Sequence, residues 1–102
     1  MEGPDEIDPG ATLEGPFYVG PGCRVAAGAR LGPDVALVGS VRLGEGASVR
    51  DSVLWSGVEI GAGARVEGAL LGQGVRVGTN AVVAAGAVLG EGTVVSDFSR
   101  TS

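Results

Sequence analysis

The sequence predicts an all-β domain in which short strands follow one another as the sides of a triangular coil. An aliphatic residue returns after every six positions from Ile7 to Val95, in sixteen units of which two are one residue short. Twenty glycines with two Phe, one Tyr and one Trp argue against an ordinary globular core. Valine-rich units with regular glycines favour strands, because β-branched residues and glycine both disfavour helices.

Each unit is predicted to hold three strand residues followed by a corner, and three units make one turn of about 18 residues. The chain then forms about five triangular coils over residues 7–100, with residues 1–6 as a lead-in that can be disordered and residues 101–102 as a tail. Most units have glycine at the fourth place, and Asp34 and Asn80 take that place in two of them. These residue types tolerate the positive φ that a sharp corner requires.

Within each strand, the aliphatic residue and the residue two positions before it are predicted to point inward. The second inward position is mostly small, which suits a narrow core: Ala11, Cys23, Ala29, Ala47, Ser52, Ala64, Ala69, Ala81 and Ala87. Phe17 is the exception, and we expect its ring to cap the open end of the first coil. Cys23, the single cysteine, is expected to be a buried and inert thiol.

The residue before each aliphatic position points outward, which divides the surface into three faces. One face carries Glu6, Arg24, Arg42, Glu59, Arg76 and Val94, and a second carries Thr12, Arg30, Ser48, Arg65, Val82 and Arg100. The third face is apolar, with Val38 and Trp55 flanking an outward row of Tyr18, Ala36, Val53, Leu70 and Val88. An exposed apolar row with aromatic anchors is typical of a protein–protein interface.

Composition excludes several classes of function. The net charge of −5, with no lysine or histidine, disfavours nucleic acid and anionic membrane surfaces as partners. One cysteine excludes an internal disulfide and a Cys-based zinc cage, and the Gly-x-Gly steps are corners because no phosphate-loop motif accompanies them. We therefore predict no catalytic, cofactor-binding or metal-binding residue. No apolar run of membrane-spanning length and no signal peptide occur, so a cytoplasmic location is expected.

The two short units begin at Val49 and Val66, which places both deletions at the same corner of consecutive coils. The run Asp51-Ser52-Val53-Leu54-Trp55 and the segment that follows it resemble the C-terminal domain of sugar nucleotidyltransferases. This family comprises the NDP-sugar pyrophosphorylases, mannose-1-phosphate guanylyltransferase among them. The resemblance implies a hexapeptide-repeat, single-stranded left-handed parallel β-helix that serves subunit assembly and sometimes regulation. The family's nucleotide-binding catalytic domain is not in this chain, so we expect no catalysis by the chain itself.

Three functions stay open at this point. The first is a non-catalytic assembly or regulatory module, whose partner is a second copy of the chain or a nucleotidyltransferase catalytic domain. The second is a small hexapeptide-repeat acyltransferase whose base is a carboxylate, with Glu45, Asp51, Glu59 and Glu67 as candidates. The third is a sensor for a sugar phosphate that binds anions through Arg24, Arg42 and Arg76.

Overall fold

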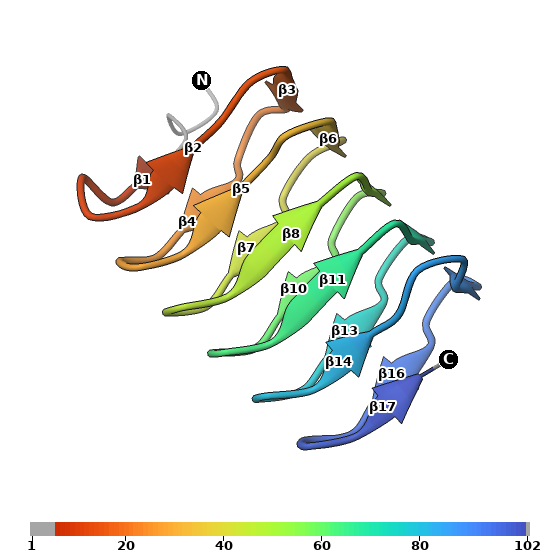
Figure 1. The fold of residues 1–102 in the computed structure, drawn as a ribbon. Helices are drawn as coiled ribbons and strands as arrows, with labels where there is room; N and C mark the ends of the chain where they lie inside the picture. Colours follow the sequence, from red (N-terminus) through yellow and green to blue (C-terminus); the bar gives the residue numbers. More distant parts are fainter. Residues whose placement is uncertain (1–5, 102) are drawn as a thin grey trace.

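The computed structural model describes residues 6–101, and these form a stack of about five turns built from parallel β-strands (Figure 1). The predicted lead-in falls almost entirely outside the described residues, since only Glu6 belongs to them. Strand β1 (Glu6–Ile7) lies at one end of the stack and β17 (Arg100–Thr101) lies at the other. Within residues 6–101, no helix has the length and apolar character that crossing a bilayer requires.

Within residues 6–101, seventeen strands of two or three residues form three parallel sheets, which are the faces of the prism. Sheet A contains, in spatial order, β1, β4 (Arg24–Val25), β7 (Arg42–Leu43), β10 (Glu59–Ile60), β13 (Arg76–Val77) and β16 (Val94–Val95). Sheet B contains β2 (Thr12–Leu13), β5 (Arg30–Leu31), β8 (Ser48–Arg50), β11 (Arg65–Glu67), β14 (Val82–Val83) and β17. Sheet C contains β3 (Phe17–Val19), β6 (Val35–Leu37), β9 (Val53–Leu54), β12 (Leu70–Leu71) and β15 (Val88–Leu89).

The predicted fold class is confirmed, and so is the register of its coils. Tyr18 pairs with Ala36 on sheet C, and Arg30 pairs with Ser48 on sheet B, as the spacing of the units requires. The pairing stays in register across both short units, since Ala36 is opposite Val53, and Val53 is opposite Leu70. The three outward rows therefore lie on the three faces that the sequence predicts.

Most strands are shorter than the predicted three residues, and the hydrogen bonds at the corners explain the difference. Ala29 donates its amide to the carbonyl of Ala26 in its own corner, at 3.2 Å. Ala47 and Ala64 do the same with the carbonyls of Gly44 and Gly61. Because the amide of the small inward residue closes a turn, it does not join the ladder between coils. Most strands therefore keep only their outward residue and the aliphatic residue that follows it.

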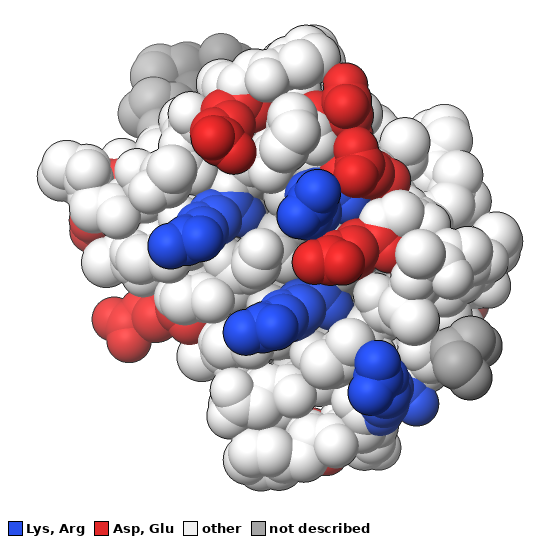
Figure 2. Space-filling view, in the orientation of Figure 1, with Lys and Arg blue, Asp and Glu red and all other residues white. Residues whose placement is uncertain are grey.

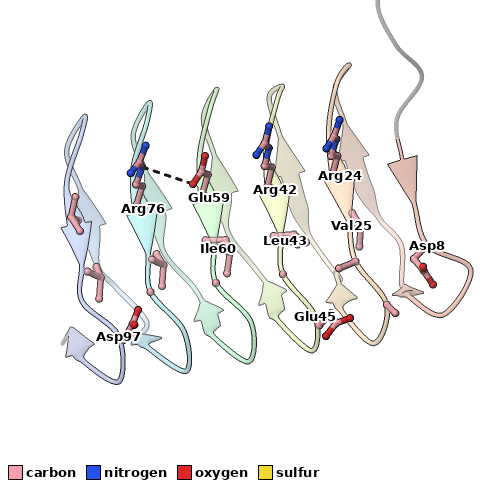
Figure 3. Close-up of a pocket in the computed structure, with 18 of the residues that line it drawn as sticks. Asp8, Arg24, Val25, Arg42, Leu43, Glu45, Glu59, Ile60, Arg76 and Asp97 are labelled. Atoms are coloured by element: carbon pink, nitrogen blue, oxygen red, sulfur yellow. Dashed lines mark ion pairs between the residues drawn. The ribbon is translucent and has the colours of Figure 1, made fainter.

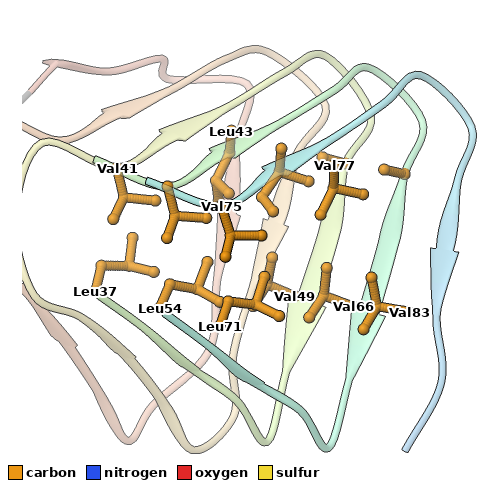
Figure 4. Packing of buried hydrophobic residues seen from close by; sticks show 14 of the residues in the cluster. Leu37, Val41, Leu43, Val49, Leu54, Val66, Leu71, Val75, Val77 and Val83 are labelled. Atoms are coloured by element: carbon orange, nitrogen blue, oxygen red, sulfur yellow. The ribbon is translucent and has the colours of Figure 1, made fainter. Parts of the chain in front are cut away.

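The core is a set of stacked rows, in which each aliphatic side chain packs on its equivalents in the coils above and below. Leu37, Leu54 and Leu71 form one row and Val49, Val66 and Val83 form another, all fully buried (Figure 4). The small inward residues from Cys23 to Ala81 are buried too, which confirms the predicted narrow interior and the buried thiol. The prediction for Phe17 is wrong, because this side chain is 42% exposed and lies outside the core cluster.

The corners contain most of the residues with positive φ. The prediction is confirmed at Asp34, Asn80, Gly22, Gly28, Gly46, Gly57, Gly63, Gly74, Gly86 and Gly92, whereas Gly10 does not adopt a positive φ. At the two shortened corners, the residues with positive φ are Asp51, at 50°, and Gly68, at 60°. In the five-residue units the residue with positive φ is therefore the third of the unit and not the fourth. Asp and Gly both tolerate this left-handed conformation.

Candidate functional site

Sheet C presents an apolar row on its outer surface, with one side chain from each of its five strands. Tyr18 is 59% exposed, Leu70 is 41% exposed and Val88 is 72% exposed. Ala36 and Val53, between them in the row, are half-buried. The structure therefore brings together the five outward residues predicted for this face, and none of them carries a charge.

Two further predicted residues, Val38 and Trp55, lie directly after the strands of sheet C. Each continues the ladder by one hydrogen bond, from the amide of Val38 to the carbonyl of Leu54 and from the amide of Trp55 to the carbonyl of Leu71. The indole of Trp55 is 47% exposed, whereas Val38 is half-buried. Trp55 therefore extends the apolar surface to the edge of sheet C that leads to sheet A.

A hollow of about 320 Å³ borders this row at the corner between sheets B and C. Its wall includes the two shortened corners, through Asp51 and Gly68, and its floor includes the outward residues Val53, Leu70 and Val88. The corner of the preceding coil contributes Asp34. The two short units thus lie beside the apolar row, so the most distinctive feature of the sequence shapes the edge of this surface.

Ser52 compensates for the residue missing from the second short unit. Its side chain is buried, its hydroxyl donates to the carbonyl of Arg50 at 2.7 Å, and its oxygen accepts from the amide of Ala69 at 3.1 Å. In units of six residues, the equivalent amide bonds to a carbonyl three positions back, as Ala64 does to Gly61. The five-residue unit has no such turn, and the serine hydroxyl of the coil below supplies the missing acceptor.

Sheet A borders a larger groove of about 1000 Å³ that runs across the coils (Figure 3). Arg24, Arg42 and Arg76 lie along one side, and the carboxylates Asp8, Glu45 and Asp97 lie along the other. Glu59 stands between Arg42 and Arg76 in the register, and its carboxylate forms an ion pair with Arg76 at 3.9 Å. The arginine row predicted as an anion site is therefore interrupted by a negative charge.

The carboxylates considered for acid–base chemistry lie at the surface. Glu45, Asp51 and Glu67 are exposed, and Glu59 is half-buried and paired with Arg76. None of the four is enclosed in a buried site. Over the described residues, no cluster of three or more His, Cys, Asp or Glu side chains could hold a metal ion.

Comparisons with known proteins place this geometry in a family. A family model described as the GMPPB C-terminal domain matches residues 13–100. No curated protein matches the chain by sequence. The acetyltransferase domain of PglB from Neisseria gonorrhoeae, solved with acetyl coenzyme A, has a TM-score of 0.72 at 23% identity, over 94% of this chain and 56% of that one. A second structure of that domain has a TM-score of 0.62 at 29% identity, over 92% and 50% of the two chains.

A mutant GDP-perosamine N-acetyltransferase from Caulobacter crescentus, solved with CoA and GDP-perosamine, has a TM-score of 0.68 at 23% identity, over 92% of this chain and 50% of that one. The chain thus spans about half the length of the solved structures that it matches. Their likeness supports the hexapeptide-repeat, left-handed β-helix fold that the sequence predicts. Because the family model covers residues 13–100, the chain belongs to the family of GMPPB C-terminal domains.

Proposed function

We propose that the chain is a non-catalytic assembly module of the sugar nucleotidyltransferase type, and that the apolar face of sheet C is its contact surface. The observation that carries the proposal is the uncharged row of Tyr18, Ala36, Val53, Leu70 and Val88, in a family whose name marks it as a domain of a larger protein. Participation in sugar nucleotide biosynthesis and a cytoplasmic location are parts of the same proposal and remain predictions.

The proposed occupant of the face is a second copy of the chain. Each copy carries a net charge of −5, so contact between two copies costs least where the touching surface carries no charge. The outward row of sheet C is uncharged, whereas the outward rows of sheets A and B both contain arginines, and that of sheet A also contains Glu59. A two-fold contact places the same patch on both copies. Covering Leu70 or Val88 contributes less than the roughly 1.5–3 kcal/mol of a wholly exposed side chain, because the two are 41% and 72% exposed beforehand.

Light scattering on the wild-type chain and on Leu70→Glu tests the proposal. We expect the wild type to be a dimer or larger oligomer and Leu70→Glu to be a monomer, because the new carboxylate would face its own copy across an apolar contact. Val94→Glu is the matched control, since it adds the same charge at an exposed outward valine of sheet A. A wild type that is monomeric throughout, or a control that dissociates equally, would overturn self-association through sheet C.

A nucleotidyltransferase catalytic domain is the other partner that the family implies. If the wild-type chain and Val94→Glu bind this domain and Leu70→Glu does not, the assembly role stands. The occupant of the face would then be the catalytic domain and not a second copy of the chain. Binding of that domain by all three chains would place its contact away from sheet C.

The alternative function is acyl transfer, favoured by the 29% identity with the acetyltransferase domain of PglB. It requires a base other than histidine, since the chain contains none, and the four candidate carboxylates all reach the surface. Calorimetric titration with acetyl coenzyme A decides between the two functions. Micromolar binding would support acyl transfer, whereas no heat of binding at millimolar ligand would remove it.

A further inference from the structure

The charged side chains of sheet B gather around an uncharged centre, Ser48. Ser48 pairs with Arg30 on one side and with Arg65 on the other, so the two arginines flank it on neighbouring strands, about 10 Å apart along the sheet. Both arginines are exposed, and Ser48 is half-buried between them. Figure 2 shows basic side chains over this sheet surrounding uncharged surface, with acidic side chains beside them.

A hollow of about 530 Å³ opens at this centre. Its lining combines arginine side chains with two glycine corners, which contribute no side chain to fill the space: Gly28, Arg30, Gly46, Ser48, Arg50, Arg65 and Glu67. A second hollow of about 280 Å³ adjoins it, because Arg30, Ser48 and Arg50 line both. A small molecule could therefore contact three guanidinium groups and one hydroxyl from the same side of the sheet.

The ion pairs of this region leave positive charge available. Within residues 6–101, neither Arg30 nor Arg65 forms an ion pair. Arg50 lies 3.8 Å from Asp51, but both side chains are about half exposed, and exposed pairs of this kind are weak. Glu67 is the one carboxylate in the larger hollow, where it pairs in register with Arg50. The larger hollow therefore has three guanidinium groups against one carboxylate, whereas Glu14 lines the smaller hollow beside it. The excess of positive charge is confined to the larger hollow, around Arg30 and Arg65.

Sheet A lacks this arrangement. There Glu59 occupies the place between Arg42 and Arg76, where sheet B has the neutral Ser48, and it pairs with Arg76. An anion on sheet A would have to displace that carboxylate, whereas an anion on sheet B meets a hydroxyl that can donate a hydrogen bond. The register of the coils thus favours sheet B over the row that the sequence alone suggests.

We propose that the hollow around Ser48 binds the phosphoryl group of a small phosphate ester. Guanidinium groups match phosphate oxygens in geometry as well as in charge, and charge-assisted hydrogen bonds are stronger than neutral ones. Arg30 and Arg65 hold the phosphoryl group from two sides, and the Ser48 hydroxyl donates to it between them. Glu67 can only accept hydrogen bonds when ionised, so it suits a hydroxyl group on the body of the ester.

This inference goes beyond the proposed assembly function and is independent of it, since sheets B and C are separate faces. Titration of the isotope-labelled chain with a hexose 1-phosphate, with inorganic phosphate and with the free hexose tests it by NMR. We expect saturable shifts of the amides of Arg30, Ser48 and Arg65 with both phosphates, and none with the free hexose. No saturable shift of these amides up to about 20 mM phosphate would overturn the proposal.

Two matched pairs of variants distinguish a specific phosphate site from non-specific electrostatic attraction. Arg65→Gln should weaken hexose 1-phosphate binding by about tenfold or more, whereas Arg42→Gln, which removes the same charge from sheet A, should leave it within about twofold. Glu67→Gln should strengthen binding of inorganic phosphate, and Glu91→Gln, at a corner remote from the hollow, should not. Equal effects within each pair would mean that only the net charge matters, and would overturn the proposal.

Both arginines are exposed, so the variants are expected to fold, and the spectrum of the free protein verifies this. Arg30→Gln provides a second test of the same contact, because it removes the other flanking guanidinium. Loss of phosphate binding in Arg30→Gln and Arg65→Gln alike, with retained dispersion of the spectrum, would support the two-sided site. Retained affinity in both would contradict it.

Discussion

Replacing Ser52 by alanine tests the account of the shortened corner. The hydroxyl makes two hydrogen bonds, but the two partners differ in what remains after its removal. The carbonyl of Arg50 also accepts from the amide of Gly68 at 3.0 Å, so it keeps a partner. Among the described residues, the amide of Ala69 bonds only to Ser52 and lies in a buried residue, so it would be left without an acceptor.

A buried donor that loses its acceptor costs about 1–3 kcal/mol, and this sets the magnitude for Ser52→Ala. For a chain of this size, each kcal/mol corresponds to about 4–8 °C in Tm, so a decrease of at least about 4 °C is expected. Urea unfolding followed by circular dichroism measures the free energy of unfolding directly. The indole of Trp55, three residues further along the chain, supplies a local fluorescence probe of the same transition.

Ser56→Ala is the control for this substitution. Ser56 is only half-buried, lies in the corner between sheets C and A, and makes no side-chain hydrogen bond within residues 6–101. Its replacement should change the free energy of unfolding by less than about 0.5 kcal/mol. If Ser52→Ala were as stable as this control, the hydroxyl would not be the acceptor that makes the five-residue unit possible.

Three further substitutions probe the coil geometry. Gly44→Ala should destabilise the fold by about 1–3 kcal/mol in urea unfolding, because its Cβ would lie 2.6 Å from the backbone nitrogen of Ala62 in the next coil. Gly90→Ala is the control, because Gly90 also directly follows a strand but has open space around the added Cβ, and it should be close to neutral. Leu54→Ala should lower the free energy of unfolding by about 2–5 kcal/mol, since the side chain is fully buried. Phe98→Asn should raise Tm, because Phe98 has a φ of 61°, which asparagine tolerates better, and its exposed ring contributes little burial; an unchanged or lower Tm would contradict this.

Most of the fold could be predicted because one residue type repeats at one spacing. An aliphatic residue every six positions fixes which side chains point inward, and the two short units fix where the register shifts by one. These two facts predict that Tyr18 pairs with Ala36 and that Val53 pairs with Leu70, although each pair is more than 15 residues apart in sequence. The structure contains both pairs. The sequence places Arg100 on the face of sheet B but assigns residue 101 to a tail, because Thr101 stands where the pattern calls for an aliphatic residue; in the structure Thr101 belongs to β17 with Arg100.

The site was predicted in part for the same reason. The outward residues of sheet C follow from alternation along each strand, so the apolar row could be derived without coordinates. The hollow beside it could not, because its shape depends on how far the shortened corners at Asp51 and Gly68 lie from their neighbours. The acceptor role of Ser52 also required the structure, since the sequence shows only a small residue at an inward position.

The cluster around Ser48 was missed although the sequence contains a signal for it. Arg30 and Arg65 lie 18 residues before and 17 residues after Ser48, which is one coil in each direction. The outward rows of sheets A and B each contain three arginines, and they differ in that Glu59 separates Arg42 from Arg76, whereas Ser48 separates Arg30 from Arg65. Counting like charges along a face is therefore a poorer guide than asking which residue separates them.

The prism geometry explains how one short repeat can support surfaces of different chemistry. Each outward side chain has its closest neighbours one coil above and one coil below on the same sheet, whereas the inward residues of all three sheets meet in one core. Changes to the outward row of sheet C therefore leave the packing of the core and the arginines of sheet B in place. For this reason Leu70→Glu should not alter phosphate binding, and Arg65→Gln should not alter the mass in solution. Coupling between the two, in either direction, would mean that assembly brings sheet B of one copy close to its partner.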